Sequence, residues 1–155
     1  MQLPKPAPEL KNLDYFAGTW LLEGEMKAGA WGPAGRIVQT DRNQWMEGGF
    51  FLIMRSEFTV STGRGAGVAY LGYDPDEEVY TYDEFNSLGE AIHSRGTVSA
   101  DTWTWSGERK VENRITKTRW VVKILSPASY DFRFELSQDG TSWIIVMAGK
   151  ATKQE

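Results

Sequence analysis

The sequence predicts an all-β protein, a single closed antiparallel up-and-down β-barrel of about ten strands with a short N-terminal helix. The 155 residues include 7 Trp, 6 Tyr, 7 Phe and 16 Gly. Aromatic residues suit pleated, half-buried surfaces, and glycine suits turns and bulges. Strand-like runs follow one another at the spacing of antiparallel β proteins, with connections too short for crossover helices. Closure into a barrel removes the exposed edges of such a sheet.

The chain divides into an extended N-terminal arm over 1–8 and one barrel domain over 9–155. Proline at positions 4, 6 and 8 keeps the arm extended. The next segment, Glu9 to Phe16, is predicted to form a short helix, because its large apolar residues recur every three positions. We expect this helix to close one end of the barrel, where Trp20 acts as the plug.

Ten strands are then expected, separated by turns rich in Gly, Pro, Asn and Asp. They span 19–27, 36–46, 50–61, 66–73, 79–85, 91–99, 102–106, 114–125, 129–137 and 142–152. The pairs Asp74-Pro75 and Asp139-Gly140 are typical turn sequences. The polar stretch 107–113 is interpreted as a loop. The loops 28–35, 62–65 and 86–89 are expected to surround the open end.

Alternation within the strands predicts which face of each is buried, because successive side chains point to opposite faces. In the ninth strand, Tyr130, Phe132, Phe134 and Leu136 share one face. In the eighth, Trp120, Val122 and Ile124 lie opposite charged residues. The tenth strand is apolar on both faces, so one face should be covered, either by the N-terminal arm or by a second copy in a homodimer.

Composition excludes several classes of function. The formal net charge of −4 and the absence of a basic run argue against nucleic-acid binding. Cysteine is absent, which excludes thiol catalysis and cysteine-based metal sites. No apolar stretch approaches the roughly 20 residues of a membrane-spanning helix, and the first 13 residues do not form a signal peptide. We therefore expect a cytoplasmic protein without a metal or other cofactor.

Several stretches resemble a known family. Gly18-Thr19-Trp20, after the short helix, resembles the Gly-x-Trp signature of the calycins, which include lipocalins, fatty-acid-binding proteins and haem-binding nitrobindins. Longer stretches resemble the bacterial domain-of-unknown-function 1579 family, in register from about Leu10 to Lys153. They are 13–20, 71–74, 96–98, 102–105, 137–143 and 149–153. The resemblance implies a closed lipocalin-like barrel with an internal cavity, and no catalytic residues. In lipocalins a late arginine packs over the signature tryptophan, so Arg119 and Arg133 are both candidates here.

His93 is the only histidine and so the only candidate for a haem ligand of the nitrobindin kind. The histidine ligand of that group lies near the C-terminus, whereas His93 is in the middle of the chain. Alternation places His93 with Arg95 and Thr97, on a face that could meet solvent. A solvated or hydrogen-bonded strand histidine is the alternative.

A polar group inside the cavity is a second candidate site. Tyr80, Tyr82 and Glu84 share a face, and with Arg95 or Arg133 they could bind a carboxylate, as the Arg and Tyr of fatty-acid-binding proteins do. Trp103 and Trp105 could form a wall on which a ligand stacks. For the first group the alternative is cross-strand pairing on the surface, and for the tryptophans it is structural packing.

The function that the sequence favours is non-enzymatic binding of a small hydrophobic ligand inside the barrel. One alternative is an enzyme or a haem-binding protein on the same barrel, for which a buried, strongly perturbed Glu84 or His93 would be the mark. The other is an interaction protein that forms a homo-oligomer and whose lumen is filled by its own side chains.

Overall fold

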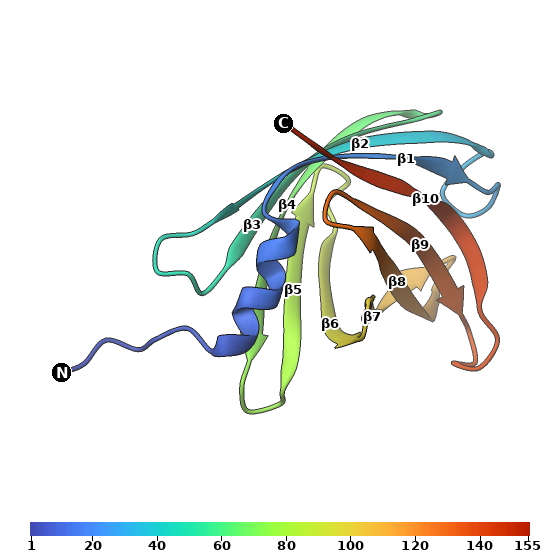
Figure 1. The fold of residues 1–155 in the computed structure, drawn as a ribbon. Coiled ribbons are helices and arrows are strands. Elements are labelled where there is room, and N and C mark those ends of the chain that lie inside the picture. Colours follow the sequence, from blue (N-terminus) through green and yellow to red (C-terminus); the bar gives the residue numbers. More distant parts are fainter.

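The computed structural model describes residues 1–155 and shows a closed barrel of ten antiparallel strands with one helix, which confirms the predicted fold class. The strands are β1 (Gly18–Met26), β2 (Gly35–Trp45), β3 (Leu52–Val60), β4 (Gly63–Asp74), β5 (Val79–Asn86), β6 (Ala91–Ser99), β7 (Thr102–Val111), β8 (Arg114–Ser126), β9 (Ser129–Ser137) and β10 (Ile144–Gln154). Each strand pairs with its neighbours in sequence, and β1 pairs with β10 to close the barrel (Figure 1).

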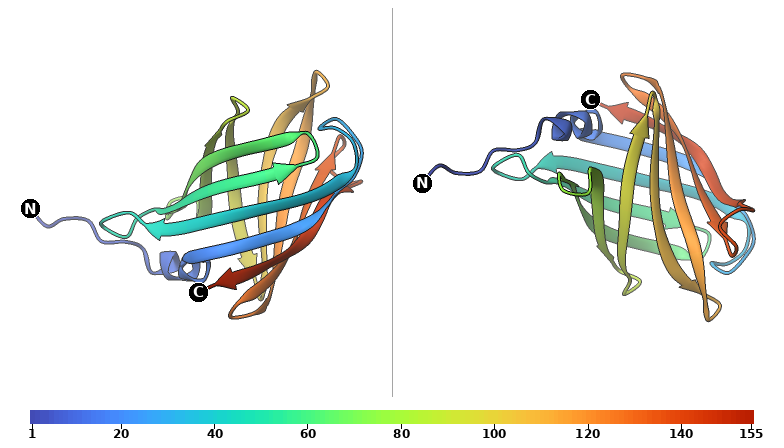
Figure 2. Two further views of the ribbon diagram at one scale, coloured as in Figure 1. Left: turned by 90° about the horizontal axis from the view of Figure 1, so that it is seen from above. Right: turned by 90° about the horizontal axis from the view of Figure 1, so that it is seen from below.

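The up-and-down order places alternate connections at opposite ends of the barrel (Figure 2). One end carries the helix and the connections 46–51, 75–78, 100–101 and 127–128. The other end carries 27–34, 61–62, 87–90, 112–113 and 138–143, and we call it the mouth. The predicted alternation of β9 is confirmed, because Tyr130, Phe132 and Leu136 are each less than a tenth exposed.

The helix η1 (Pro8–Phe16) is a 3₁₀-helix, and it lies at the end of the barrel from which the N-terminal arm leaves (Figure 1). A 3₁₀-helix has three residues per turn, so side chains three positions apart lie on the same side. Leu10, Leu13 and Phe16 therefore all face the barrel, and all three are buried. The three-residue spacing in the sequence thus specifies both the helix and its packing.

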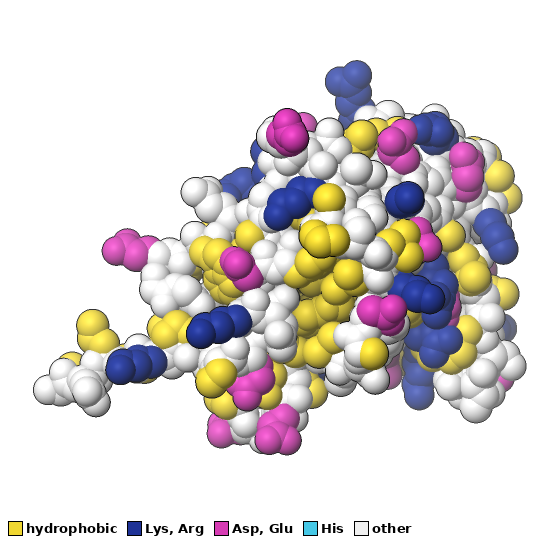
Figure 3. Space-filling view, viewed as in Figure 1, with side chains coloured by type: hydrophobic (Ala, Val, Ile, Leu, Met, Phe, Trp, Pro, Cys, Tyr) yellow, Lys and Arg dark blue, Asp and Glu magenta, His cyan; other side chains and the backbone are white.

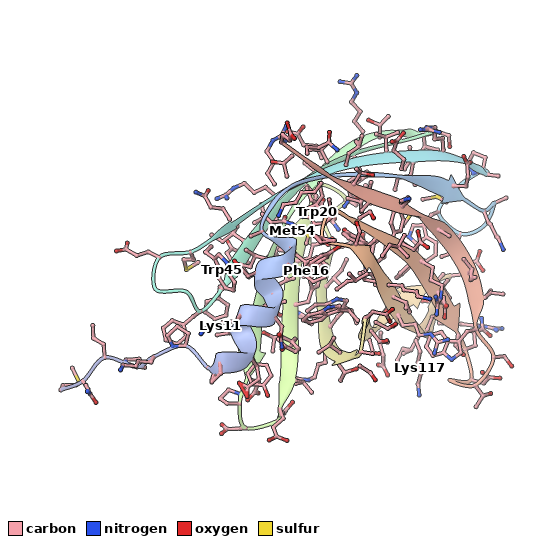
Figure 4. The ribbon with its side chains drawn as sticks, in the orientation of Figure 1. Lys11, Phe16, Trp20, Trp45, Met54 and Lys117 are labelled. Atoms are coloured by element: carbon pink, nitrogen blue, oxygen red, sulfur yellow. The ribbon has the colours of Figure 1, made fainter.

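Trp20 is completely buried beside η1 and closes this end of the barrel (Figure 4). Its indole Nε1 donates a 3.0 Å hydrogen bond to the carbonyl oxygen of Phe16. Asn43 Nδ2 on β2 donates to the same oxygen at 2.8 Å, which ties the end of the helix to the barrel wall. Gly18 has φ of +107°, a conformation that glycine adopts readily, and it turns the chain from the helix into β1.

The cation over the Trp20 ring is Lys153, whose Nζ lies 5.8 Å from the ring centroid. The expectation that Arg119 or Arg133 fills this position is therefore corrected. Lys153 is the β10 residue paired with Trp20 in the β1–β10 register, so its side chain points to the same face. Both arginines point to the outer face of the barrel.

Several strand boundaries differ from the prediction. β7 continues to Val111, and the polar stretch after Ser106 is strand rather than loop. The lumen near the mouth is polar, and Arg109 lines it. The inner face of this part of β7 therefore lacks the apolar alternation on which the prediction depended. β4 begins at Gly63, so the glycine-rich segment is paired with β3. β10 begins at Ile144, because Asp139 binds the backbone N–H groups of the two residues at 141 and 142.

The N-terminal arm extends away from the barrel (Figure 1), and residues 1–6 are exposed. Hydrophobic side chains gather in the middle of the face seen in Figure 3, with charged side chains around them. No helix in the structure combines the length and the hydropathy needed to cross a membrane.

Candidate functional site: the barrel lumen

The lumen contains a cavity of about 1110 Å³, and 24 of its 43 lining residues are hydrophobic. It begins beside Phe16 at the helix end and extends to the mouth. Its aromatic walls come from strands on several sides of the barrel. The aromatic lining residues are Phe16, Trp31, Phe58, Tyr82, Trp105, Trp120, Tyr130, Phe134 and Trp143. Such a lining can surround an apolar molecule and exclude water from it.

All three loops that were expected at the open end contribute lining residues there, namely 28–31, 62–64 and the turn at Asn86 and Leu88. Trp31, in the loop between β1 and β2, reaches across the mouth to Phe134 on β9. Their ring centroids are 6.0 Å apart in an edge-on arrangement. The mouth is therefore partly covered by an aromatic side chain from a loop.

Asp41 on β2 is the most deeply buried charged residue of the lining, with 2% of its surface exposed. Gln39 Nε2 donates to its Oδ1 at 2.8 Å, and the hydroxyl of Ser56 on β3 donates to the same oxygen at 2.6 Å. Burial raises the pKa of Asp41 from 3.8 to about 6, the two hydrogen bonds oppose this rise, and the negative charge of Glu84 adds to it. At neutral pH the carboxylate is mostly ionised, at a cost in free energy.

Glu84 on β5 is the second carboxylate of the inner wall. The Tyr82 hydroxyl donates to its Oε1, and Asn86 Nδ2 donates to its Oε2 at 2.8 Å. Burial raises the pKa of Tyr82 well above its ordinary value, and the charge of Glu84 raises it further, so Tyr82 remains a hydrogen-bond donor. Glu84 is held in place by two neutral donors, and its carboxylate lines the lumen.

The basic residue beside this group, Arg109 on β7, is already engaged. Its Nη1 lies 3.6 Å from Glu90, and its guanidinium lies 5.4 Å from the centroid of the Phe134 ring. Asn86 also donates to Glu90, at 3.2 Å, so the polar residues of the lumen form a connected network. Within this network Glu90 has a cationic partner, and Asp41 and Glu84 do not.

Tyr80 and Trp103, expected to contact a ligand, lie in the core at the helix end rather than on the cavity wall. The Tyr80 hydroxyl donates to the Glu9 carbonyl and accepts from Asn12, both at 2.9 Å. Trp103 is 2% exposed and stacks on Trp105 with the ring centroids 5.8 Å apart. Of the expected aromatic wall, Trp105 and Tyr82 line the cavity.

Arg95 and His93 lie on the outer face of β6. Arg95 pairs with Glu77 at 3.3 Å, and its side chain is 58% exposed. The His93 side chain is 68% exposed, with Nδ1 2.6 Å from Asp83 Oδ1. Alternation sets both positions, since Ile92 and Ser94 are the β6 residues that line the cavity. Neither side chain can contact a group bound in the lumen, so a haem there could not use His93.

Arg119 and Arg133 lie on the outer face as well, where both bind the buried carboxylate of Glu135. The Arg119 guanidinium also lies 4.0 Å from the centroid of the Trp143 ring. Burial raises the pKa of Glu135, but the hydrogen bonds from the two arginines outweigh burial and hold it below its ordinary value. These ion pairs link β8 and β9 on the outer surface of the barrel. It leaves neither arginine free to bind a carboxylate in the lumen.

Apolar residues on both faces of β10 are exposed at the start of the strand, where Ile144 is 66% and Ile145 is 38% exposed. These residues lie at the mouth. The N-terminal arm is at the opposite end of the barrel, where a Cβ at Gly49 would lie 3.5 Å from Pro6, so the arm does not cover them.

Asp41, Arg109 and Trp31 were not expected at the site. Alternation within β2 could have found Asp41, because Ile37, Asp41 and Trp45 share one face. Trp31 had no such signal, since it lies in a loop. No group of three or more His, Cys, Asp and Glu is arranged to hold a metal ion.

Comparison with known proteins supports the fold more than the site. The model of a family described as Protein of unknown function (DUF1579) matches residues 5–153. No curated protein matches the sequence. The crystal structure of Rv2717c from M. tuberculosis is similar, with a TM-score of 0.67 and 13% identity over 97% of this chain and 100% of that chain. EF1p2_mFAP2b bound to DFHBI is also similar, with a TM-score of 0.50 and 11% identity over 94% of this chain and 98% of the other.

Proposed function

The chain belongs to the family described as Protein of unknown function (DUF1579), and we propose that it binds a small hydrophobic molecule in the barrel lumen without chemical conversion. The cavity of about 1110 Å³ carries this proposal. Ligand pockets usually measure about 300–1,000 Å³ and are lined mainly by apolar side chains with a few polar groups. The volume of the lumen lies just above this range, and its lining is of this kind.

The shape of the lining favours a molecule with a flat, apolar body. Trp105, Trp120 and Phe134 come from three adjacent strands, and their rings line one side of the cavity. Aromatic side chains present large, rigid contact surfaces on which a ring can stack or pack edge-on. A ligand with fused or linked rings can contact all three residues and still pass Trp31 at the mouth.

The volume of the cavity favours binding over a barrel filled by its own side chains. An enzyme on the same barrel could use Asp41, whose pKa is raised to about 6. Its hydrogen-bonded neighbour Ser56 has no histidine to activate it, because the only histidine is on the outer face. Binding needs only the cavity and its lining, whereas catalysis by Ser56 would also need an activating base.

A fluorescence titration with N-phenyl-1-naphthylamine tests this proposal. The dye is neutral and apolar, and its emission rises when water is excluded from it. We expect saturable binding to the wild-type protein. Replacing Thr118, an inward-facing residue that is 5% exposed, by phenylalanine should fill part of the lumen and weaken binding by about tenfold or more.

The control is Lys117→Phe, which adds the same side chain one residue earlier on the outer face of β8, away from the helix end (Figure 4). This variant should bind the dye as the wild type does. Equal affinity in the Thr118→Phe and Lys117→Phe variants would contradict binding in the lumen. Absence of saturable binding to the wild type would contradict the proposed function itself.

A further inference from the structure

The charges on the cavity wall are unbalanced. Among the lining residues, Asp and Glu outnumber Lys and Arg by five to three. Lys27 and Arg64 lie at the mouth, and Arg109 is paired with Glu90. The inner carboxylates Asp41 and Glu84 therefore have hydrogen-bond donors but no cation. Carboxylates buried without a cation are costly, and a ligand that supplies positive charge would offset this cost.

One oxygen of Asp41 lacks a protein partner. Both hydrogen bonds to this carboxylate, from Gln39 and from Ser56, end on Oδ1. No donor of the protein reaches Oδ2, although Asp41 is 98% buried and lines the cavity. An ionised carboxylate accepts several hydrogen bonds, and those to a charged donor are the strongest. Oδ2 is therefore a ready acceptor for an N–H group of a ligand.

Glu84 and the aromatic walls add to the attraction for a cation. The charge of Glu84 is close enough to Asp41 to raise its pKa, so both carboxylates act on the same part of the lumen. Tyr82 and Trp105 line the cavity with their ring centroids 5.9 Å apart. Ring faces attract ammonium groups. An anionic group in this place would meet two negative charges, and the nearby guanidinium of Arg109 is already paired with Glu90.

We propose that the lumen selects apolar, ring-containing molecules that carry a protonated amine, with Asp41 Oδ2 as the acceptor of its N–H, over carboxylates of the same size. This inference rests on the proposed function, because it names the chemical class of the ligand in the same cavity. It is the reverse of the carboxylate site expected from Arg95 or Arg133. The apolar body lies between the aromatic walls, and the ammonium group faces the two carboxylates.

Calorimetric titration at pH 7.5 with three probes of one shape tests the inference. The probes are 1-naphthylmethylamine, which is a cation at this pH, neutral 1-naphthalenemethanol and anionic 1-naphthoate. We expect the amine to bind about tenfold or more tightly than the alcohol, since one charge-assisted hydrogen bond supplies that ratio, and the naphthoate to bind most weakly.

Asp41→Asn keeps an oxygen for Gln39 and Ser56 and removes the charge, so the preference for the amine over the alcohol should fall to about threefold or less. Glu84→Gln should reduce it by a smaller factor. The matched control is Asp83→Asn, which removes a carboxylate beside Glu84 but on the outer face of β5, and it should leave the preference unchanged.

Each outcome separates the inference from the proposed function. Equal binding of all three probes, or tighter binding of the naphthoate, would overturn the selectivity for amines and leave lumenal binding intact. Retention of the full preference in Asp41→Asn would show that Asp41 is not the acceptor of the ligand N–H group. If no probe bound and N-phenyl-1-naphthylamine also failed to bind, both proposals would fall.

Discussion

Asp41 on β2 accepts a 2.6 Å hydrogen bond from the hydroxyl of Ser56 on β3, at a position where only 2% of the aspartate surface is exposed. The two residues face each other directly in the β2–β3 register. The serine and Gln39 partly replace the water that the carboxylate loses on folding. Because they do not replace it fully, the ionised form is disfavoured and the pKa rises to about 6.

Asp41→Asn should therefore stabilise the protein at pH 7.5. The rise in pKa from 3.8 to about 6 corresponds to a penalty of up to about 3 kcal/mol for the ionised form in the folded state. Asparagine removes this penalty and can still accept both hydrogen bonds. We expect a gain of roughly 1–3 kcal/mol in the free energy of unfolding by urea denaturation. A loss of stability at pH 7.5 would contradict this account.

The same variant should show a characteristic pH dependence. Between about pH 4 and 7 the folded state binds more protons at Asp41 than the unfolded state does, so wild-type stability rises as the pH falls through this range. The advantage of Asp41→Asn should shrink accordingly to about a third of its size at about pH 4.5 and nearly vanish at about pH 3. The titratable groups facing Asp41 remain in both proteins; they are Tyr82 and Glu84 on β5 and Tyr130 on β9. A pH-independent difference would mean that Asp41 is not the titrating group.

Trp20→Phe should loosen the helix end of the barrel. The change removes the donor to the Phe16 carbonyl and leaves a void in a fully buried position. We expect a loss of about 2 kcal/mol or more in the free energy of unfolding. The control is Trp143→Phe at the mouth, where the half-buried ring lies beside the Arg119 guanidinium, and it should cost less than about 1 kcal/mol. Equal costs would contradict the role given to Trp20.

Gly96→Ala should disturb the stacked pair of Trp103 and Trp105. A Cβ atom at Gly96 would lie 2.5 Å from the Trp105 ring, which is closer than two carbon atoms can approach. Overpacking of this kind costs about 1–3 kcal/mol, and the near-ultraviolet circular dichroism of the tryptophans should change. Gly29→Ala is the control, because a Cβ there meets nothing within 4 Å. An unchanged spectrum and unchanged stability in Gly96→Ala would contradict the close packing of Trp105 on Gly96.

Trp31→Ala should open the mouth. The indole packs against Phe134 from a loop, so its loss removes a barrier to exit at little cost in stability. In stopped-flow experiments the dissociation rate of N-phenyl-1-naphthylamine should increase roughly three- to tenfold. Phe51→Ala removes an exposed ring from the helix end and should leave this rate unchanged. A rate unaffected by Trp31→Ala would place the exit elsewhere.

Much of the fold could be predicted from local alternation and turn chemistry. The alternating apolar residues of β9 correctly gave its inward face, and the three-residue spacing in η1 gave its packing. The end of β7 was missed because Arg109, a polar residue, points into the lumen. Alternation identifies a buried face only where that face is apolar. Strand segments whose inner face is polar are therefore missed by this kind of prediction.

The candidate site was harder to predict than the fold. Tyr82, Glu84 and Trp105 could be predicted because strand alternation groups aromatic and charged residues on one face. Asp41 was missed, although alternation in β2 placed it on the inner face, because the surrounding residues are polar. Arg95 was predicted to contribute to a carboxylate site in the lumen, although alternation in β6 places it on the outer face with His93. Which side chains meet across a barrel depends on pairings between strands far apart in sequence, and a single sequence does not specify them.

The most direct test of lumenal binding is a crystal structure of the protein with N-phenyl-1-naphthylamine. The account predicts electron density for the rings inside the barrel, in contact with Trp105, Trp120 and Phe134. An empty lumen, with the dye bound instead at the exposed Ile145 outside the barrel, would contradict it.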